Sequence, residues 1–246
     1  MTIPKVINYC WFGGNPLPPL AIKCIGSWRK YFPDYEIKEW NENNFDINMI
    51  SYIRDAYAAK RYAFVSDYAR FWILYHEGGL YFDTDVEVVK PMSDIIMKGP
   101  FMGREKKNDT ISPIAPGLGL GIYAGHELYK ELLDFYSNLE FILPNGSYNK
   151  KTIVEYTTEF LEKYGLSSND KLENVKGIWI YPTEYFCPLN YITGELSITD
   201  NTYTIHHYMA SWISKSELLY KKISKIIGKN NTHRLANLLK ILKIIK

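Results

Sequence analysis

The chain has 246 residues, long enough to bury the core of one full-sized α/β domain. Its residues are 46% hydrophobic and 23% charged, as in an ordinary soluble globule, and no run of about 18 uncharged apolar residues predicts a membrane-spanning helix. The net charge is +2, and the three cysteines, Cys10, Cys24 and Cys187, include no C-x-x-C pair, which argues against a disulfide scaffold or a zinc cluster and favours reduced thiols.

The predicted elements alternate between strands and helices along the chain. In the first half we expect strands at 5–12 and 35–40, helices at 20–31, 46–60 and 61–76, and a strand-like run at 80–89 that Asp83-Thr84-Asp85 interrupts. In the second half we expect strands at 100–104, 117–125, 178–182 and 203–208, with helices at 126–138 and 151–164. This alternation predicts an α/β fold with a sheet flanked by helices.

The strongest chemical signal is Asp83-Thr84-Asp85, which follows Tyr81-Phe82. Two carboxylates two residues apart on an extended strand point the same way, and at a strand end or turn both can reach one divalent cation. Oxygen ligands suit Mg²⁺ or Mn²⁺, and such a cation can neutralise a diphosphate and make it a better leaving group. Two solvated loop carboxylates would give the same D-x-D pattern, but the preceding Gly-Gly turn and the apolar flanks favour a functional site.

A second signal is Ser66-Asp67 with Arg70 on the predicted helix 61–76. Asp67 and Arg70 are three residues apart and share one helix face, where a surface salt bridge would be the simplest interpretation. The residues around them are apolar on nearly every side, however, and buried charges need a partner or a ligand. A carboxylate that accepts sugar hydroxyls and a guanidinium that binds phosphate would both satisfy that need.

Two weaker signals lie at the ends of predicted strands. Trp11, before Gly13-Gly14, can stack on a nucleobase, although a core position explains it as well. His206-His207 can complete the coordination of a metal, although an ordinary polar strand end would look the same. The glycines of the segment 117–121 read G-x-G-x-G and do not match a dinucleotide fingerprint.

Taken together, these segments resemble the family 32 glycosyltransferases, which carry a D-x-D sugar-binding motif. The resemblance rests on IPKVINYCWFGG, SDYAR, HEGGLYFDTDVEVV and HHYMASW, and it covers roughly residues 3–105 and then 203–212. The family includes fungal α-mannosyltransferases and bacterial capsule or O-antigen sugar transferases, and the pattern is more distantly similar to the clostridial glucosylating toxins. It implies a GT-A-type nucleotide-sugar-binding fold with a mixed central sheet, a divalent metal and transfer with retention of configuration.

The resemblance also implies a donor, an acceptor and roles for individual residues. A UDP-linked hexose or N-acetylhexosamine is the favoured donor, with GDP-mannose as the alternative, and the acceptor would be a hydroxyl of a surface polysaccharide or lipid-linked glycan. The segment 113–185 matches no motif, so the acceptor site and any nucleophile stay unassigned. His206 is the alternative to His207 as the late metal ligand. The implied roles are Asp83 at ribose and metal, Asp85 and His207 on the metal, Asp67 and Arg70 on the donor sugar, Trp11 against the base, and Ser211 with Trp212 over the diphosphate.

Other interpretations of the D-x-D remain open. A dehalogenase-type phosphatase also uses D-x-D, but it wants Thr or Val where this chain has Glu87, and it carries the motif on its first strand. A non-catalytic, membrane-associated sugar-binding protein would fit better if one motif carboxylate were missing, but both are present. Nucleic-acid binding would fit a basic tail, but the tail has only Tyr220 as an interleaved aromatic residue.

The charge divides the chain into a predicted catalytic domain, 1–214, and a basic tail, 215–246. The tail holds nine Lys or Arg and one acidic residue, which leaves 20 basic and 26 acidic residues for the remainder. Its leucines and isoleucines recur at helical spacing between lysines, a pattern typical of amphipathic helices on an anionic membrane, although packing on the acidic domain is the alternative. We expect a cytoplasmic enzyme at the inner membrane face, since the N-terminus does not read as a secretory signal.

Overall fold

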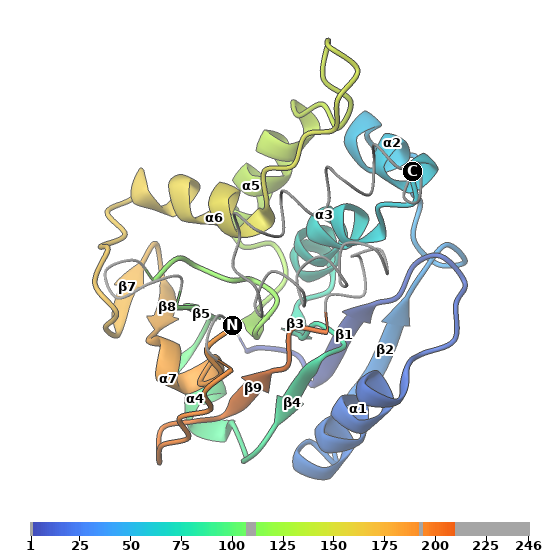
Figure 1. The fold of residues 1–246 in the computed structure, drawn as a ribbon. Coiled ribbons are helices and arrows are strands. Elements are labelled where there is room, and N and C mark those ends of the chain that lie inside the picture. The colour runs from blue at the N-terminus through green and yellow to red at the C-terminus, as the bar shows by residue number, and fades with distance from the viewer. Residues whose placement is uncertain (1, 107–111, 192–193, 210–246) are drawn as a thin grey trace, which may run out of the picture. The chain divides into compact units, whose positions relative to one another are not determined.

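A computed structural model describes residues 2–106, 112–191 and 194–209, and the described residues up to Tyr208 belong to one compact unit. Its centre is a mixed seven-stranded sheet in the order β2-β1-β3-β6-β5-β8-β7 (Figure 1). β1 pairs in parallel with β2 and β3, and β5 with β8, while the other pairings are antiparallel. The strands are β1 (Val6–Cys10), β2 (Glu36–Trp40), β3 (Gly79–Tyr81), β5 (Phe101–Gly103), β6 (Leu120–Ile122), β7 (Glu173–Val175) and β8 (Ile178–Tyr181).

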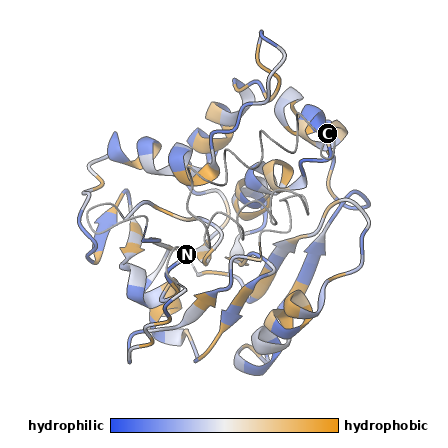
Figure 2. Ribbon diagram, in the orientation of Figure 1, coloured by the Kyte–Doolittle hydropathy of each residue, from blue (hydrophilic) through white to orange (hydrophobic). Residues whose placement is uncertain are grey.

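Helices cover both faces of this sheet. On one face lie α2 (Ser51–Ala58), α3 (Tyr62–His76), α5 (Glu127–Ser137) and α6 (Ile153–Glu162), and on the other α1 (Pro19–Tyr31), α4 (Ser93–Lys98) and α7 (Thr183–Phe186) (Figure 1). Hydrophobic and hydrophilic stretches lie next to each other along α1, α5 and α6, as expected of helices with one buried side (Figure 2).

Neighbouring residues of the strands face opposite layers, so they enter two separate cores. Leu80 and Phe101 pack with α1 and α4, whereas Tyr81 and Met102 pack with α3 and α5. This alternation is what a strand buried on both faces requires. The α/β fold with a mixed central sheet flanked by helices is therefore confirmed.

A second, two-stranded sheet brings the late part of the chain next to the D-x-D motif. The run predicted at 80–89 is divided into β3 and β4 (Val86–Val88), and β4 leaves the main sheet to pair with β9 (Thr204–His206). The antiparallel register places Val86 opposite His206. The interruption at 83–85 therefore acts as the corner between the two sheets.

Most predicted elements are present, with shifts of a few residues at their ends. The helix predicted at 46–60 is shorter, because only Ser51–Ala58 is helical. Three short elements were not predicted, namely α4, β7 and α7. The basic tail predicted at 215–246 lies outside the described residues, and no helix within the described part of the chain is long and apolar enough to cross a membrane.

Candidate active site

The Gly78-Gly79 turn places the D-x-D motif beside α3. α3 ends at His76, and Gly78 and Gly79 have φ values of +70° and +100°, a region that suits glycine. A Cβ on Gly79 would lie 2.7 Å from the carbonyl oxygen of Val6. The chain therefore reverses directly into β3 alongside β1. Asp83, two residues past the end of β3, then faces the side chain of Arg70.

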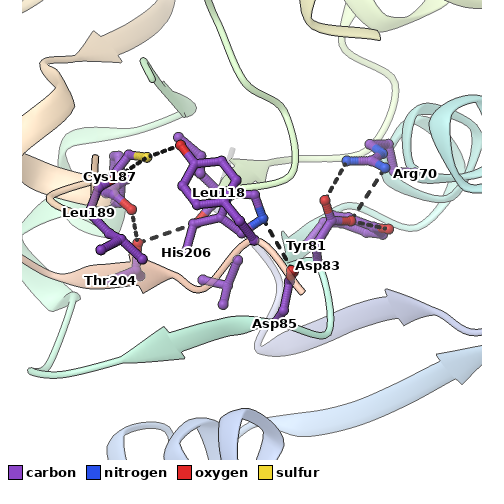
Figure 3. A network of polar contacts seen from close by, with 12 residues as sticks. Arg70, Tyr81, Asp83, Asp85, Leu118, Cys187, Leu189, Thr204 and His206 are labelled. Carbon is purple, nitrogen blue, oxygen red and sulfur yellow. Dashed lines mark hydrogen bonds and ion pairs between the residues drawn. The ribbon is translucent and has the colours of Figure 1, made fainter. Parts of the chain in front are cut away.

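Arg70 holds two buried or partly buried carboxylates together. Its Nη2 lies 3.0 Å from Oδ1 of Asp67, one turn earlier on α3. Its two terminal nitrogens, Nη1 and Nη2, each lie 3.3 Å from a carboxylate oxygen of Asp83 (Figure 3). The Tyr81 hydroxyl also donates to Asp83 at 3.2 Å, and the Arg70 guanidinium lies over the Tyr81 ring. A two-pronged contact of this kind fixes the carboxylate in orientation as well as in position.

Burial and charge set the titration of this cluster. Asp67 is only 8% exposed, and burial raises its pKa to about 7 although Arg70 opposes the change. Burial is the largest single influence and would lower the pKa of Arg70, but Asp83, Tyr81 and Asp67 together outweigh burial and keep this pKa above its ordinary value. Arg70 is therefore a permanent cation in the buried site, the group that an anionic ligand needs.

Gly117 is a site residue that the sequence did not identify. The Asp83 N–H donates to its carbonyl oxygen at 2.9 Å, and a Cβ at this position would lie 1.8 Å from Oδ2 of Asp83. Only glycine leaves room for the carboxylate to reach Arg70. The clustering of glycines in 117–121 was the available signal, and its meaning is a close backbone approach rather than a phosphate loop.

The second carboxylate of the motif lies beside a histidine from β9. His206 Nε2 is 3.3 Å from Oδ1 of Asp85, and both side chains are largely buried (Figure 3). Burial is the largest single influence and lowers the pKa of His206, but the Asp85 carboxylate and Cys187 together outweigh burial, so the pKa lies well above its usual value. The β4–β9 pairing therefore brings together two residues that are 121 positions apart in the sequence.

His207, expected as the late metal ligand, lies elsewhere. Its Nε2 is 2.8 Å from the carboxylate of Glu87, which also binds Lys23 at 2.8 Å. β9 ends at His206, and His207, one residue past the strand, faces Glu87 instead of the motif. The structure places the alternative, His206, beside Asp85, while the backbone N–H of His207 donates to the Asp85 carbonyl oxygen.

Trp11 lies at the carboxyl end of β1, as expected for a residue near a nucleotide site. Its indole N–H donates to the carbonyl oxygen of Asn15 at 2.6 Å, and the side chain is half-buried. Glu42 accepts from the Gly13 backbone N–H and from the Tyr57 hydroxyl, which fixes the loop after Trp11. The base platform stays a prediction, and Ser211 and Trp212 lie outside the described residues.

The three metal ligands expected together, Asp83, Asp85 and His207, do not converge on one point. Within the described residues no three His, Cys, Asp or Glu side chains form a group that could hold a metal. Asp83 faces Arg70, and His207 faces Glu87. Asp85 and His206 nevertheless offer a carboxylate oxygen and an imidazole nitrogen to one another. This oxygen–nitrogen donor pair fits a divalent ion such as Mn²⁺, with further ligands from a diphosphate and water.

Comparison with known proteins agrees with this arrangement. Residues 18–102 match the family described as "Glycosyltransferase sugar-binding region containing DXD motif", a range that includes the α3 charges and both motif aspartates. Over these residues the chain is similar to a DXD glycosyltransferase sugar-binding region. This result confirms the sequence-based resemblance over that region, whereas His206 lies outside the matched residues.

Two curated relatives and one solved structure extend the comparison. The inositol phosphoceramide mannosyltransferase 1 of Schizosaccharomyces pombe is 31% identical over 111 residues, which are 41% of this chain and a third (33%) of that protein. The uncharacterized glycosyltransferase L373 of Acanthamoeba polyphaga mimivirus is 23% identical over 93% of this chain and 89% of its own length.

The structure of the PaToxG glycosyltransferase superposes with a TM-score of 0.50 at 20% identity, covering 65% of this chain and 69% of that one. An identity this low is informative about the fold only. Together with the mixed sheet, it shows that the chain has the GT-A-type fold, as the family resemblance implied.

Proposed function

We propose that this chain is a metal-dependent glycosyltransferase that moves a sugar from a nucleotide-sugar donor to an acceptor hydroxyl. The single observation that carries the proposal is that two groups of buried or partly buried polar side chains meet at one D-x-D turn. One is the Arg70 guanidinium with the carboxylates of Asp67 and Asp83, and the other is Asp85 with the imidazole of His206. Buried charges at the carboxyl end of a strand are costly to a protein unless they bind something.

Each group has a task in this chemistry. Arg70 and the carboxylate of Asp67 are placed to bind the donor, the cation by charge and the carboxylate by accepting sugar hydroxyls. Asp85 and His206 would hold the divalent ion, which would neutralise charge that develops on the leaving diphosphate. Asp83, fixed by Arg70 and Tyr81, is oriented to accept from the ribose side of the donor. Two adjacent carboxylates thus take different roles because their neighbours differ.

We propose a UDP-linked hexose or N-acetylhexosamine as the donor, with the half-buried Trp11 ring as the partner of the base. A mannosyl donor linked to GDP is the second candidate, because the S. pombe relative is named a mannosyltransferase. A thermal-shift panel of nucleotide sugars with Mn²⁺ separates the two. We expect UDP-sugars to raise the melting temperature most, and stabilisation by GDP-mannose alone would refute the UDP choice.

Retention of anomeric configuration is proposed for the transfer. In a front-face reaction the acceptor oxygen forms its bond to the anomeric carbon while the bond to the diphosphate breaks, and the leaving phosphate takes the acceptor proton. No separate general base is then required among the site residues. NMR of the first-formed product should show an α-linkage from an α-linked donor, and a β-linkage would overturn this part of the proposal.

The acceptor proposed is a hydroxyl of a surface polysaccharide or a lipid-linked glycan at the inner face of the membrane. The support is the basic, amphipathic sequence 215–246, which would attract the enzyme to anionic lipid and so raise the local acceptor concentration. Deletion of 216–246 should abolish sedimentation with anionic liposomes while donor hydrolysis continues. If the full-length protein does not sediment with such liposomes at low salt, the proposed membrane attachment through 215–246 is wrong.

A further inference from the structure

The orientation of His206 requires an explanation. Histidines that bind metals usually donate through their second ring nitrogen to a fixed acceptor, which sets the direction of the first. Here Nε2 faces Asp85, but Nδ1 is buried and makes no hydrogen bond with the described part of the protein. The packing around the ring, which includes the Cys187 side chain, must therefore help to hold it.

Tyr208, two residues later, packs against this ring. The two ring centroids are 4.2 Å apart, with an angle of 43° between the ring planes. Tyr208 has a φ of +50°, in the left-handed region that an aromatic residue adopts only when its surroundings hold it there. Such a conformation costs on the order of 1–3 kcal/mol.

The contact that holds Tyr208 is made at its hydroxyl. The phenolic oxygen lies 2.9 Å from Sγ of Cys187, which is 3% exposed (Figure 3). Cys187 follows α7 directly, and its backbone N–H donates to the carbonyl oxygen of Thr183 at 2.8 Å. One residue earlier, the carbonyl oxygen of Phe186 accepts from the Thr204 hydroxyl at 3.0 Å. The Cys187 sulfur is thus fixed relative to β9, the strand that ends in His206.

We propose that Tyr208, anchored through its hydroxyl to Cys187, is a positioning residue that fixes the His206 ring with Nε2 toward Asp85. The inference rests on the proposed function, in which Asp85 and His206 hold a divalent ion. Without the hydroxyl contact the left-handed conformation at 208 loses its support and the Tyr208 ring leaves His206. The histidine then populates several ring orientations, of which only one presents Nε2 to the ion.

The experiment compares Tyr208→Phe and Cys187→Ala with the matched control Tyr203→Phe. Tyr203 lies just before β9 and its hydroxyl binds Asp94, so the control removes a phenolic hydroxyl from the same segment without touching His206. The probe is Mn²⁺ itself, titrated by electron paramagnetic resonance. We expect the two test variants to bind Mn²⁺ about 10-fold more weakly, the lower end of the usual effect of outer-shell changes, and the control to bind as the unaltered protein does.

A spectroscopic signature separates positioning from a general loss of stability. Pulsed electron paramagnetic resonance of bound Mn²⁺ should show ¹⁴N modulation from the His206 ring. When the variants carry equal amounts of bound Mn²⁺, this modulation should fall in Tyr208→Phe but persist in Tyr203→Phe. In the metal-free protein, ¹⁵N NMR of the His206 ring should show one sharp state that becomes broadened or split in Tyr208→Phe. Unchanged modulation, or an unchanged metal-free ring signal, would overturn the inference.

Two further variants tell a failure of the inference from a failure of the proposed function. Asp85→Asn and His206→Ala should each weaken Mn²⁺ binding more than Tyr208→Phe does. If both weaken it while Tyr208→Phe does not, the ion site stands and the positioning role is wrong. If neither weakens it, the ion site itself is wrong, and the metal-free NMR comparison alone decides the role of Tyr208.

Discussion

The two halves of the D-x-D turn are built in opposite ways. Asp83 is held by local structure, since Arg70 and Tyr81 lie within 13 residues of it and bind both of its oxygens. Asp85 pairs with His206, which the short β4–β9 pairing brings near. The first half is a charge cluster that is satisfied before any ligand arrives. In the second half a ligand ion would take over the contact. We therefore expect changes in the first half to lower stability as well as donor binding, and changes in the second half to act mainly on turnover.

The largest effect is expected from Arg70→Met, which breaks the first half. Methionine keeps much of the volume of arginine but leaves Asp67 and Asp83 without their cation. Removing one partner of a buried ion pair costs about 3–5 kcal/mol, so urea unfolding should show a loss of that size. As a control, Lys38→Met breaks the more exposed pair with Glu77 and should cost less than about 1 kcal/mol. Equal losses would show that the Arg70 cluster is not structural.

Asp85→Asn tests the second half. The carboxamide keeps the shape of the side chain but removes the charge that would bind the ion. The rate of nucleoside diphosphate release should therefore fall about 10²–10³-fold, the equivalent of several kcal/mol. The melting temperature should fall less than in Arg70→Met, because His206, unlike Arg70, can lose its proton once the carboxylate is gone. The neighbouring substitution Glu87→Gln serves as the control and should keep most of the turnover. A variant Asp85→Asn that turns over normally would remove the basis for the proposed ion site.

Gly117→Ala distorts the first half without changing a charge. The added methyl group would overlap Oδ2 of Asp83, so either the 117 backbone or the carboxylate must move. Overpacking of this kind costs about 1–3 kcal/mol and should also weaken donor binding in isothermal titration. Gly26→Ala is the matched control, because a Cβ there has no neighbour within 4 Å and the position is helical. The control should be stabilised by up to about 1 kcal/mol.

Lys23→Ala should have the smallest effect. Lys23 is well exposed and pairs with Glu87, which also binds His207. Exposed pairs contribute less than about 1 kcal/mol, so both the free energy of unfolding and donor turnover should stay close to those of the unaltered chain. A large loss of turnover would show that the Lys23–Glu87–His207 group belongs to the site after all.

The sequence predicted the fold well in segments where the hydrophobic pattern extends over many residues. Helix 61–76 and strand 5–12 have strong patterns and appear as α3 and β1 with small shifts. α4 and α7 were not predicted because each is six residues or fewer, too short to show a period. Strand β7 was missed because it reads Glu-Asn-Val and only Val175 is buried, so no hydrophobic pattern marks it. The division of residues 80–89 between two sheets is a tertiary property, set by the partners of each part.

The sequence identified the candidate site to the extent that its residues lie close together along the chain. Asp67, Arg70, Asp83 and Asp85 lie within 19 residues, and their spacing made the motif visible. The choice between His206 and His207 depends on the face of β9, which a three-residue strand does not reveal. Gly117 acts through the space it leaves for a side chain 34 residues away; the glycine cluster marks a close backbone approach, but it does not say which side chain approaches.

The most direct test of the whole account is the release of nucleoside diphosphate from the donor that gives the largest thermal shift, measured with EDTA and then with excess Mn²⁺. The account predicts that chelation abolishes release and that Mn²⁺ restores it in the unaltered chain but not in Asp85→Asn. Undiminished release in EDTA would contradict the central claim that a divalent ion at Asp85 and His206 assists the transfer.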